Sequence, residues 1–164
     1  MKTLFLLLCI AVFAYDSLFR RVPNRLLLLA IVVQSGLLLV LGHGLDGLTP
    51  LRSLAGLGVG MAVFLPVYML GVMGAGDVKF FAALGLLLGA TPLLPVWLIG
   101  TALAGAHALA IHLVREGESL PWLQYTTLRV WHSPLYQRLV DLRGTRAGIP
   151  YAAYLAIGAA LVAG

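Results

Sequence analysis

The chain has 164 residues, enough for one domain, and 61% of them are hydrophobic whereas only 10% are charged. Its mean hydropathy of +1.00 is typical of a protein that lies in a lipid bilayer. The net charge of +5 does not indicate a nucleic-acid partner, because the lysines and arginines flank apolar runs instead of forming a basic domain. The single cysteine, Cys9, excludes a disulfide within the chain, and the four histidines lack metal-ligand spacing, so we expect neither a metal nor another cofactor.

Apolar runs separated by proline, glycine and charged residues predict an all-α polytopic membrane protein, with a single membrane-embedded domain over residues 1–164 surrounded by lipid. A helix needs about 20 residues to cross ~30 Å of hydrocarbon, so the first and fourth runs must use flanking residues, thin the bilayer or stop at a wetted cavity. The 19 glycines indicate close packing between helices. The six runs cover about residues 3–15, 26–41, 54–73, 78–90, 93–114 and 148–163.

The first run has an alternative interpretation as a secretory signal peptide. Lys2 precedes its apolar stretch, and the small residues Val12 and Ala14 stand in cleavage-like positions. The basic stretch that follows, SLFRRVPNR (residues 17–25), favours a retained helix, because arginine just after a cleavage site hinders translocation. We therefore expect residues 3–15 to form the first membrane helix.

Lysine and arginine are concentrated in the connections on one side of the predicted bundle, and such connections face the cytoplasm. The other side has only Lys2 and Arg52. Both chain termini are therefore expected outside the cytoplasm, and Asp16 at the end of the first helix and Asp77 at the start of the fourth are expected at the cytoplasmic surface. The positively charged side carries Arg20, Arg21, Arg25, Lys79, Arg115, Arg129, Arg138, Arg143 and Arg146.

Two aspartates at one membrane edge indicate a functional site, since ionisable residues are costly there. Two carboxylates that approach closely cannot both ionise, so one keeps its proton and polarises a carbonyl while the other activates a water. Gly74 and Gly76, which have no Cβ, would let an extended substrate backbone approach Asp77. Asp77 itself is expected to be the N-cap of the fourth helix. The pattern predicts an aspartic protease with Asp16 and Asp77 as the catalytic pair.

Five further residues near these positions are candidates for a supporting or substrate-binding role. Lys79 could orient substrate or influence Asp77, but it could equally be a positive anchor at the membrane surface. Pro23 and Asn24 are expected to shape the turn into the second helix. Pro150 and Tyr151 could approach the site from the last helix, although proline at a helix start is also common for structural reasons alone.

The connection over about residues 115–147 mixes aromatic residues with arginines, as do segments that lie at a membrane–water interface. We expect a cytoplasmic interfacial loop that anchors the protein to the membrane surface. A role in substrate recognition is the alternative. The aromatic residues concerned are Trp122, Tyr125, Trp131 and Tyr136.

Three motifs together resemble those of the type IV prepilin peptidases, which are GxGD-type aspartyl proteases of the prokaryotic cytoplasmic membrane. They are YDSLFRRVPNRL (15–26), GAGDVKFFAALG (74–85) and GIPYAAYLAIG (148–158). The resemblance implies an endopeptidase that removes a short basic leader from prepilins or pseudopilins on the cytoplasmic side, just before the substrate's hydrophobic helix. By motif match, it implies that Asp16 and Asp77 are the catalytic pair.

The chain differs from longer members of that family, which carry paired CxxC motifs linked to N-methylation of the trimmed pilin. This sequence has no CxxC, so N-methyltransferase activity is not predicted. It resembles the short, peptidase-only forms of tight-adherence (Flp) pilus systems. Presenilins and signal-peptide peptidases also have YD and GxGD motifs, but the PAL motif of that group is missing here.

Two other functions would place the same residues differently. In a non-catalytic membrane subunit of a pilus or secretion assembly, both aspartates would form hydrogen bonds between packed helices. In a small transporter, Asp16 and Asp77 would relay protons. Substitution of aspartate by asparagine distinguishes these functions, because only a protease loses turnover while remaining folded. The sequence indicates no particular oligomeric state.

Overall fold

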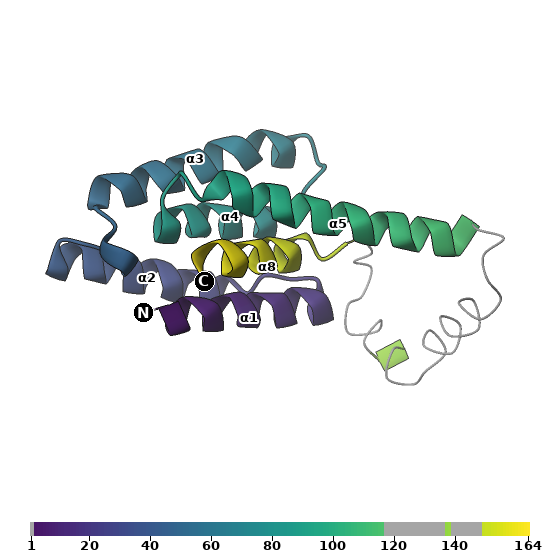
Figure 1. Ribbon diagram of the computed structural model, residues 1–164, viewed down its shortest axis with the longest axis horizontal. Helices are drawn as coiled ribbons and strands as arrows, with labels where there is room; N and C mark the ends of the chain where they lie inside the picture. The colour runs from purple at the N-terminus through teal and green to yellow at the C-terminus, as the bar shows by residue number, and fades with distance from the viewer. Residues whose placement is uncertain (1, 117–136, 139–148) are drawn as a thin grey trace.

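The structure is a computed structural model that describes residues 2–116, 137–138 and 149–164, and in these residues it is all-helical (Figure 1). It confirms the predicted all-α membrane fold. Four of the helices are long and apolar enough to cross a membrane: α1, α2, α3 and, within α5, residues Leu93–Leu113. The elements are α1 (Lys2–Phe19), α2 (Asn24–Leu41), the short 3₁₀ helix η1 (Leu45–Gly47), α3 (Pro50–Met69), α4 (Ala75–Leu88), α5 (Leu93–Glu116) and α8 (Tyr151–Ala163).

Helix α4 lies at the centre of the bundle and is only 14 residues long. At 1.5 Å per residue it covers about 21 Å, less than the hydrocarbon thickness. It packs along α3 on one side and against α2, α8 and α5 on others. All eight residues from Phe80 to Leu87 are buried. The shortness of the fourth run therefore reflects a helix enclosed by protein.

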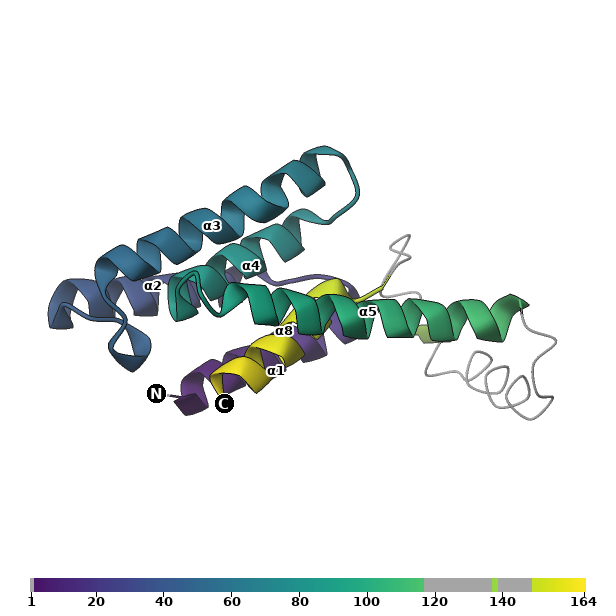
Figure 2. The same ribbon diagram turned by 45° about the horizontal axis from the view of Figure 1, so that its top comes forward.

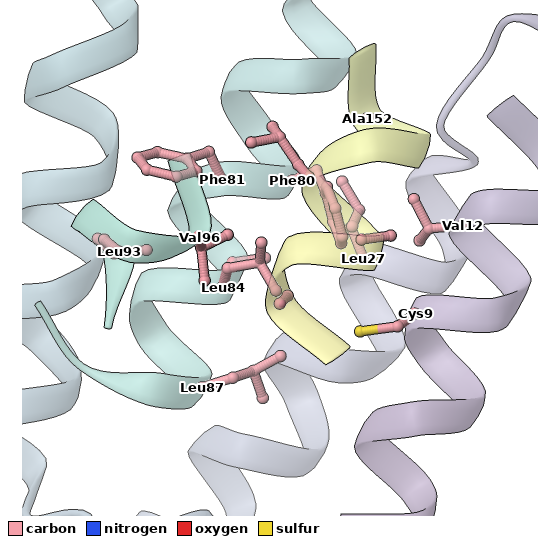
Figure 3. Close-up of a cluster of buried hydrophobic side chains, with 14 of the residues drawn as sticks. Cys9, Val12, Leu27, Phe80, Phe81, Leu84, Leu87, Leu93, Val96 and Ala152 are labelled. Carbon is pink, nitrogen blue, oxygen red and sulfur yellow. The ribbon is translucent and has the colours of Figure 1, made fainter. Parts of the chain in front are cut away.

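The hydrophobic core is built around the side chains of α4 (Figure 3). Phe80 and Leu84 are fully buried, and Phe81 stacks on Phe64 of α3 with ring centroids 4.2 Å apart. Helices α1, α2, α5 and α8 each contribute to the same cluster. Their labelled residues in the close-up are Cys9, Val12, Leu27, Leu93, Val96 and Ala152.

Helices α3 and α4 approach each other at glycines. A Cβ added at Gly56 would clash with the carbonyl oxygen of Gly85, and one added at Gly85 would clash with the carbonyl oxygen of Gly56. One turn further along α3, a Cβ at Gly60 would lie 2.8 Å from the Phe81 carbonyl oxygen. This contact is the small-xxx-small packing typical of membrane helices, in which backbones touch directly.

Helix α8 lies between α1 and α5 (Figures 1 and 2). The two chain ends meet on the same side of the bundle, where Lys2 Nζ donates a hydrogen bond to the Gly164 carbonyl oxygen at 3.3 Å. Because α1 and α8 run in opposite directions, the last turn of α1 lies near the first turn of α8 at the other end.

Some predicted helix boundaries are wrong. Helix α1 continues to Phe19, so Asp16 does not end it; the helix stops where Arg20 adopts a left-handed conformation with φ 53°. Helix α3 begins at Pro50 instead of residue 54, because proline fits the first position of a helix, and it ends at Met69, shortly before Gly71 with φ +72°. The predicted loop over 115–147 lies largely outside the described residues.

Gln34 is a buried polar residue that the sequence analysis did not single out. Its Nε2 donates to Ser53 Oγ at 3.2 Å and to the Leu86 carbonyl oxygen at 3.1 Å, and its Oε1 accepts the Leu45 N–H at 3.1 Å. The amide joins α2, η1, α3 and the C-terminal end of α4. Its burial is tolerated because both ends of the amide are hydrogen-bonded.

Candidate active site

Asp16 and Asp77 line the same cavity, which has a volume of about 560 Å³. Asp16 lies in the last turn of α1, and Asp77 lies in the first turn of α4. Since α1 runs towards this end of the bundle and α4 runs away from it, the fold brings the two helix ends together. The other lining residues are Arg20, Arg21, Val22, Asn24, Gly74, Ala75, Gly76, Lys79, Ile149 and Tyr151.

Asp16 is buried, with 6% of its surface exposed. Its Oδ2 accepts a hydrogen bond from the backbone N–H of Ala153 at 3.0 Å, and the N–H of Ala152 also reaches its carboxyl. The nearby Arg20 interacts with it electrostatically. These donors offset part of the cost of burying a carboxylate.

Asp77 is half-buried and lies close enough to Asp16 for the two carboxyls to interact electrostatically. The backbone N–H groups of Gly74 and Ala152 lie near its carboxyl. The first turn of a third helix, α8, therefore lies beside both carboxyls.

The prediction that Asp77 is the N-cap of its helix is wrong. Gly74 occupies that position, with extended backbone angles (φ −74°, ψ 144°), and Asp77 is the third helical residue. The Asp77 N–H bonds to the Gly74 carbonyl oxygen at 3.1 Å, while its carboxyl turns back to the Gly74 N–H. A side chain at the third helical position that approaches the N–H of the cap residue is one half of a capping box, and the glycine cap has no side chain to supply the other half.

The two glycines of the motif have different surroundings. A Cβ at Gly74 would lie 3.2 Å from Asp77 Oδ2, so a side chain there would press on the carboxyl. A Cβ at Gly76 would face Val22 in the α1–α2 connection at 3.4 Å, which is an ordinary contact. The space beside the Asp77 carboxyl therefore depends on the absence of a side chain at Gly74. The role of either glycine towards a substrate stays a prediction.

The α1–α2 connection brings two more predicted residues to the cavity. Lys79 is exposed, and its Nζ donates to Asn24 Oδ1 at 3.4 Å, which joins α4 to the first residue of α2. Pro23 is the N-cap of α2 and lines a neighbouring cavity with Asn24. Pro23 is thus placed at the turn, and Asn24 and Lys79 at the mouth of the site.

Pro150 and Tyr151 reach the site from the start of α8. Pro150 is the buried N-cap of that helix, and Tyr151 is its first residue and lines the cavity. The Tyr151 hydroxyl lies 2.9 Å from Thr101 Oγ1 of α5, and its ring lies 6.1 Å from that of Phe64. The third motif therefore meets the first two in space.

The sequence analysis did not place Arg20, Ala152 and Ala153 beside the aspartates. Alanine gives no signal as a functional residue, because its contribution here comes from backbone N–H groups. Arg20 was counted only as a charge, whereas its own N–H bonds the Asp16 carbonyl oxygen at 2.9 Å and its backbone has φ 53°. A non-glycine residue in that conformation is uncommon and occurs often at functional sites.

Two other observations concern possible ligands. An apolar cavity of about 300 Å³ lies between α1 and α2, but neither aspartate lines it, and it offers no polar chemistry. Among the residues that the structure describes, no group of three or more histidine, cysteine, aspartate or glutamate side chains could hold a metal ion.

The bundle is thus a membrane protein with a pair of carboxylates in one cavity, which is the kind of site that an aspartic hydrolase needs. Residues 3–109, well over half of the chain, match the type IV leader peptidase family, and the chain belongs to this family. This finding confirms the resemblance seen in the sequence. Both aspartates lie in the matched part, and α8 lies outside it. Comparisons with curated proteins and with solved structures found no match.

Proposed function

We propose that the protein is an aspartic endopeptidase that removes the short basic leader from type IV prepilins or pseudopilins. The observation that carries this proposal is the meeting of Asp16 and Asp77, from two separate motifs, in one cavity where their carboxyls interact. Membership of the type IV leader peptidase family supports the substrate class. The absence of a CxxC motif gives no support to a methyltransferase activity.

In the proposed mechanism, the pair shares one proton and acts on a water molecule. The ionised carboxylate takes a proton from the water as its oxygen bonds to the scissile carbonyl carbon, and the protonated carboxyl donates a hydrogen bond to the carbonyl oxygen. The tetrahedral intermediate then collapses, the C–N bond breaks, and the leaving amine receives a proton from the pair. The enzyme forms no covalent bond with the substrate at any step.

We also propose that the cavity faces the cytoplasm. Arg20, Arg21 and Lys79 line it, and positively charged ends of membrane helices face the cytoplasm. Lys2 and the chain terminus Gly164 lie together at the other end of the bundle, which would then be external. In a prokaryotic cell this arrangement corresponds to the inner membrane, where the leader of a prepilin is accessible from inside.

Purified protein in detergent should shorten a prepilin that has a basic leader, detected as a size shift on a gel. Asp16→Asn and Asp77→Asn should each lower the rate at least ~100-fold, since acid–base catalysis contributes about that much or more. Asp46→Asn is the matched control, because Asp46 is exposed in η1, away from the cavity. Cleavage at the wild-type rate by Asp16→Asn would rule out the pair.

A non-catalytic role in a pilus or secretion assembly is the alternative, and the observation that favours it is the bond from Ala153 to the buried Asp16. If that bond serves packing alone, the wild type should leave prepilin uncut and Asp16→Ala should unfold at a lower temperature. Asp16→Asn can still accept the bond, so the peptidase proposal expects it to fold like the wild type and lose turnover.

A further inference from the structure

Helix α8 lies outside the part of the chain that matches the family, yet its first turn meets both aspartates. The contact joins residues 137 positions apart, from Ala153 to Asp16. Ala152 and Ala153 are the second and third residues of α8, and the first four N–H groups of a helix have no partner within the helix. These groups are therefore available to a carboxylate, and the positive end of the helix favours it.

The small side chains at these positions permit the contact. Ala152 and Ala153 are both completely buried, with 0% of their surface exposed. A larger side chain at either position would have to displace its neighbours, because protein interiors leave little free volume. Alanine thus allows the end of α8 to lie directly against the carboxyls.

The opposite face of α8 is fixed to α5. The Tyr151 hydroxyl bonds with Thr101, and the Tyr154 hydroxyl bonds with Nδ1 of His107. The two tyrosines are three residues apart, so they lie on one face of the helix. Further along, a Cβ added at Gly158 would lie 2.7 Å from a carbonyl oxygen of α5, which shows that the backbones are in direct contact. Helix α8 is therefore held from one side while its N–H groups meet the aspartates.

We propose that α8 positions the catalytic pair: the N–H of Ala153 orients the Asp16 carboxyl through its hydrogen bond, and the positive end of the helix stabilises the negative charge that the two carboxyls share. This inference rests on the proposed peptidase function. It makes Ala153 a positioning residue that acts through its backbone, and it assigns a role in the site to the third sequence motif.

Replacing the Ala153 amide with an ester tests the proposal, because the ester lacks the N–H but keeps the side chain and its volume. A hydrogen bond to a charged group is worth about 1.5–3 kcal/mol, so kcat should fall at least ~10-fold. Both limbs of the pH–activity profile should move to higher pH by about one unit, since the lost donor favoured the charged form. The control is an ester at Leu51, which removes a first-turn N–H at an exposed position of α3.

Activity and a pH profile equal to those of the Leu51 ester would overturn the proposal. A second measurement does not depend on turnover: the ¹⁵N–¹H signal of Ala153 should change with pH as the pair titrates, and this change should be lost in Asp16→Asn. A signal that ignores pH, or that titrates identically in Asp16→Asn, would also overturn it. If the wild type fails to cut prepilin while the Ala153 signal titrates, the peptidase function fails but the contact stands.

Discussion

At the scale of single residues, the site combines side chains that the sequence reveals with backbone groups that it does not. Asp16 and Asp77 could be predicted because charges are rare in so apolar a chain and therefore attract attention. The three N–H donors at Gly74, Ala152 and Ala153 could not, since every residue except proline carries such a group. The prediction placed Asp77 at the N-cap of α4, whereas the first glycine of the GxGD motif, Gly74, occupies the cap and Asp77 is the third helical residue.

Gln34 provides a prediction at the same scale. Gln34→Ala should lower the free energy of unfolding by about 2–4 kcal/mol, because it leaves the Leu45 N–H without its partner and opens a cavity. Thermal unfolding in detergent measures the loss. Gln137→Ala is the control, since Gln137 is exposed. Gln34 contacts the end of α4 that is opposite to Asp77, so we expect the variant to keep the wild-type activity per folded molecule. A selective loss of activity would contradict this account.

At the scale of elements, the order of the helices in the described residues followed from the apolar runs, and the helix ends did not. The prediction placed the first helix end at Asp16, whereas α1 continues for another turn because the residues that follow are compatible with a helix until Arg20. The central position of α4 also could not be read from its composition, since it is as apolar as helices that face lipid. It is enclosed because glycines on α3 allow the two backbones to touch.

The α3–α4 contact gives a prediction with a control in the same helix. Gly56→Ala should destabilise the fold by about 1–3 kcal/mol, because its Cβ would overlap the Gly85 carbonyl oxygen. Gly58→Ala should be neutral or stabilise by up to about 1 kcal/mol, because nothing lies within 4 Å of its added Cβ and alanine favours helix. Thermal unfolding of both variants measures the difference, and equal stabilities would show that the backbones are not in contact.

At the scale of the whole molecule, the charges predict how the bundle sits in the membrane. Reporter fusions after residue 22 should be cytoplasmic, and fusions after residue 46 or after residue 164 should be external. The hydrogen bond between Lys2 and Gly164 supports a common side for the two termini. An external fusion after residue 22 together with a cytoplasmic fusion after residue 46 would invert the orientation and place the cavity on the external face.

The central claim is that Asp16 and Asp77 act as one catalytic unit, and the rates of prepilin cleavage by four proteins test it most directly. These are the wild type, Asp16→Asn, Asp77→Asn and the double variant, compared at equal amounts of folded protein. Residues that act together are not additive, so each single variant should lose nearly as much activity as the double variant, at least ~100-fold. Losses that multiply, or a single variant that keeps a tenth or more of the wild-type rate, would contradict the claim.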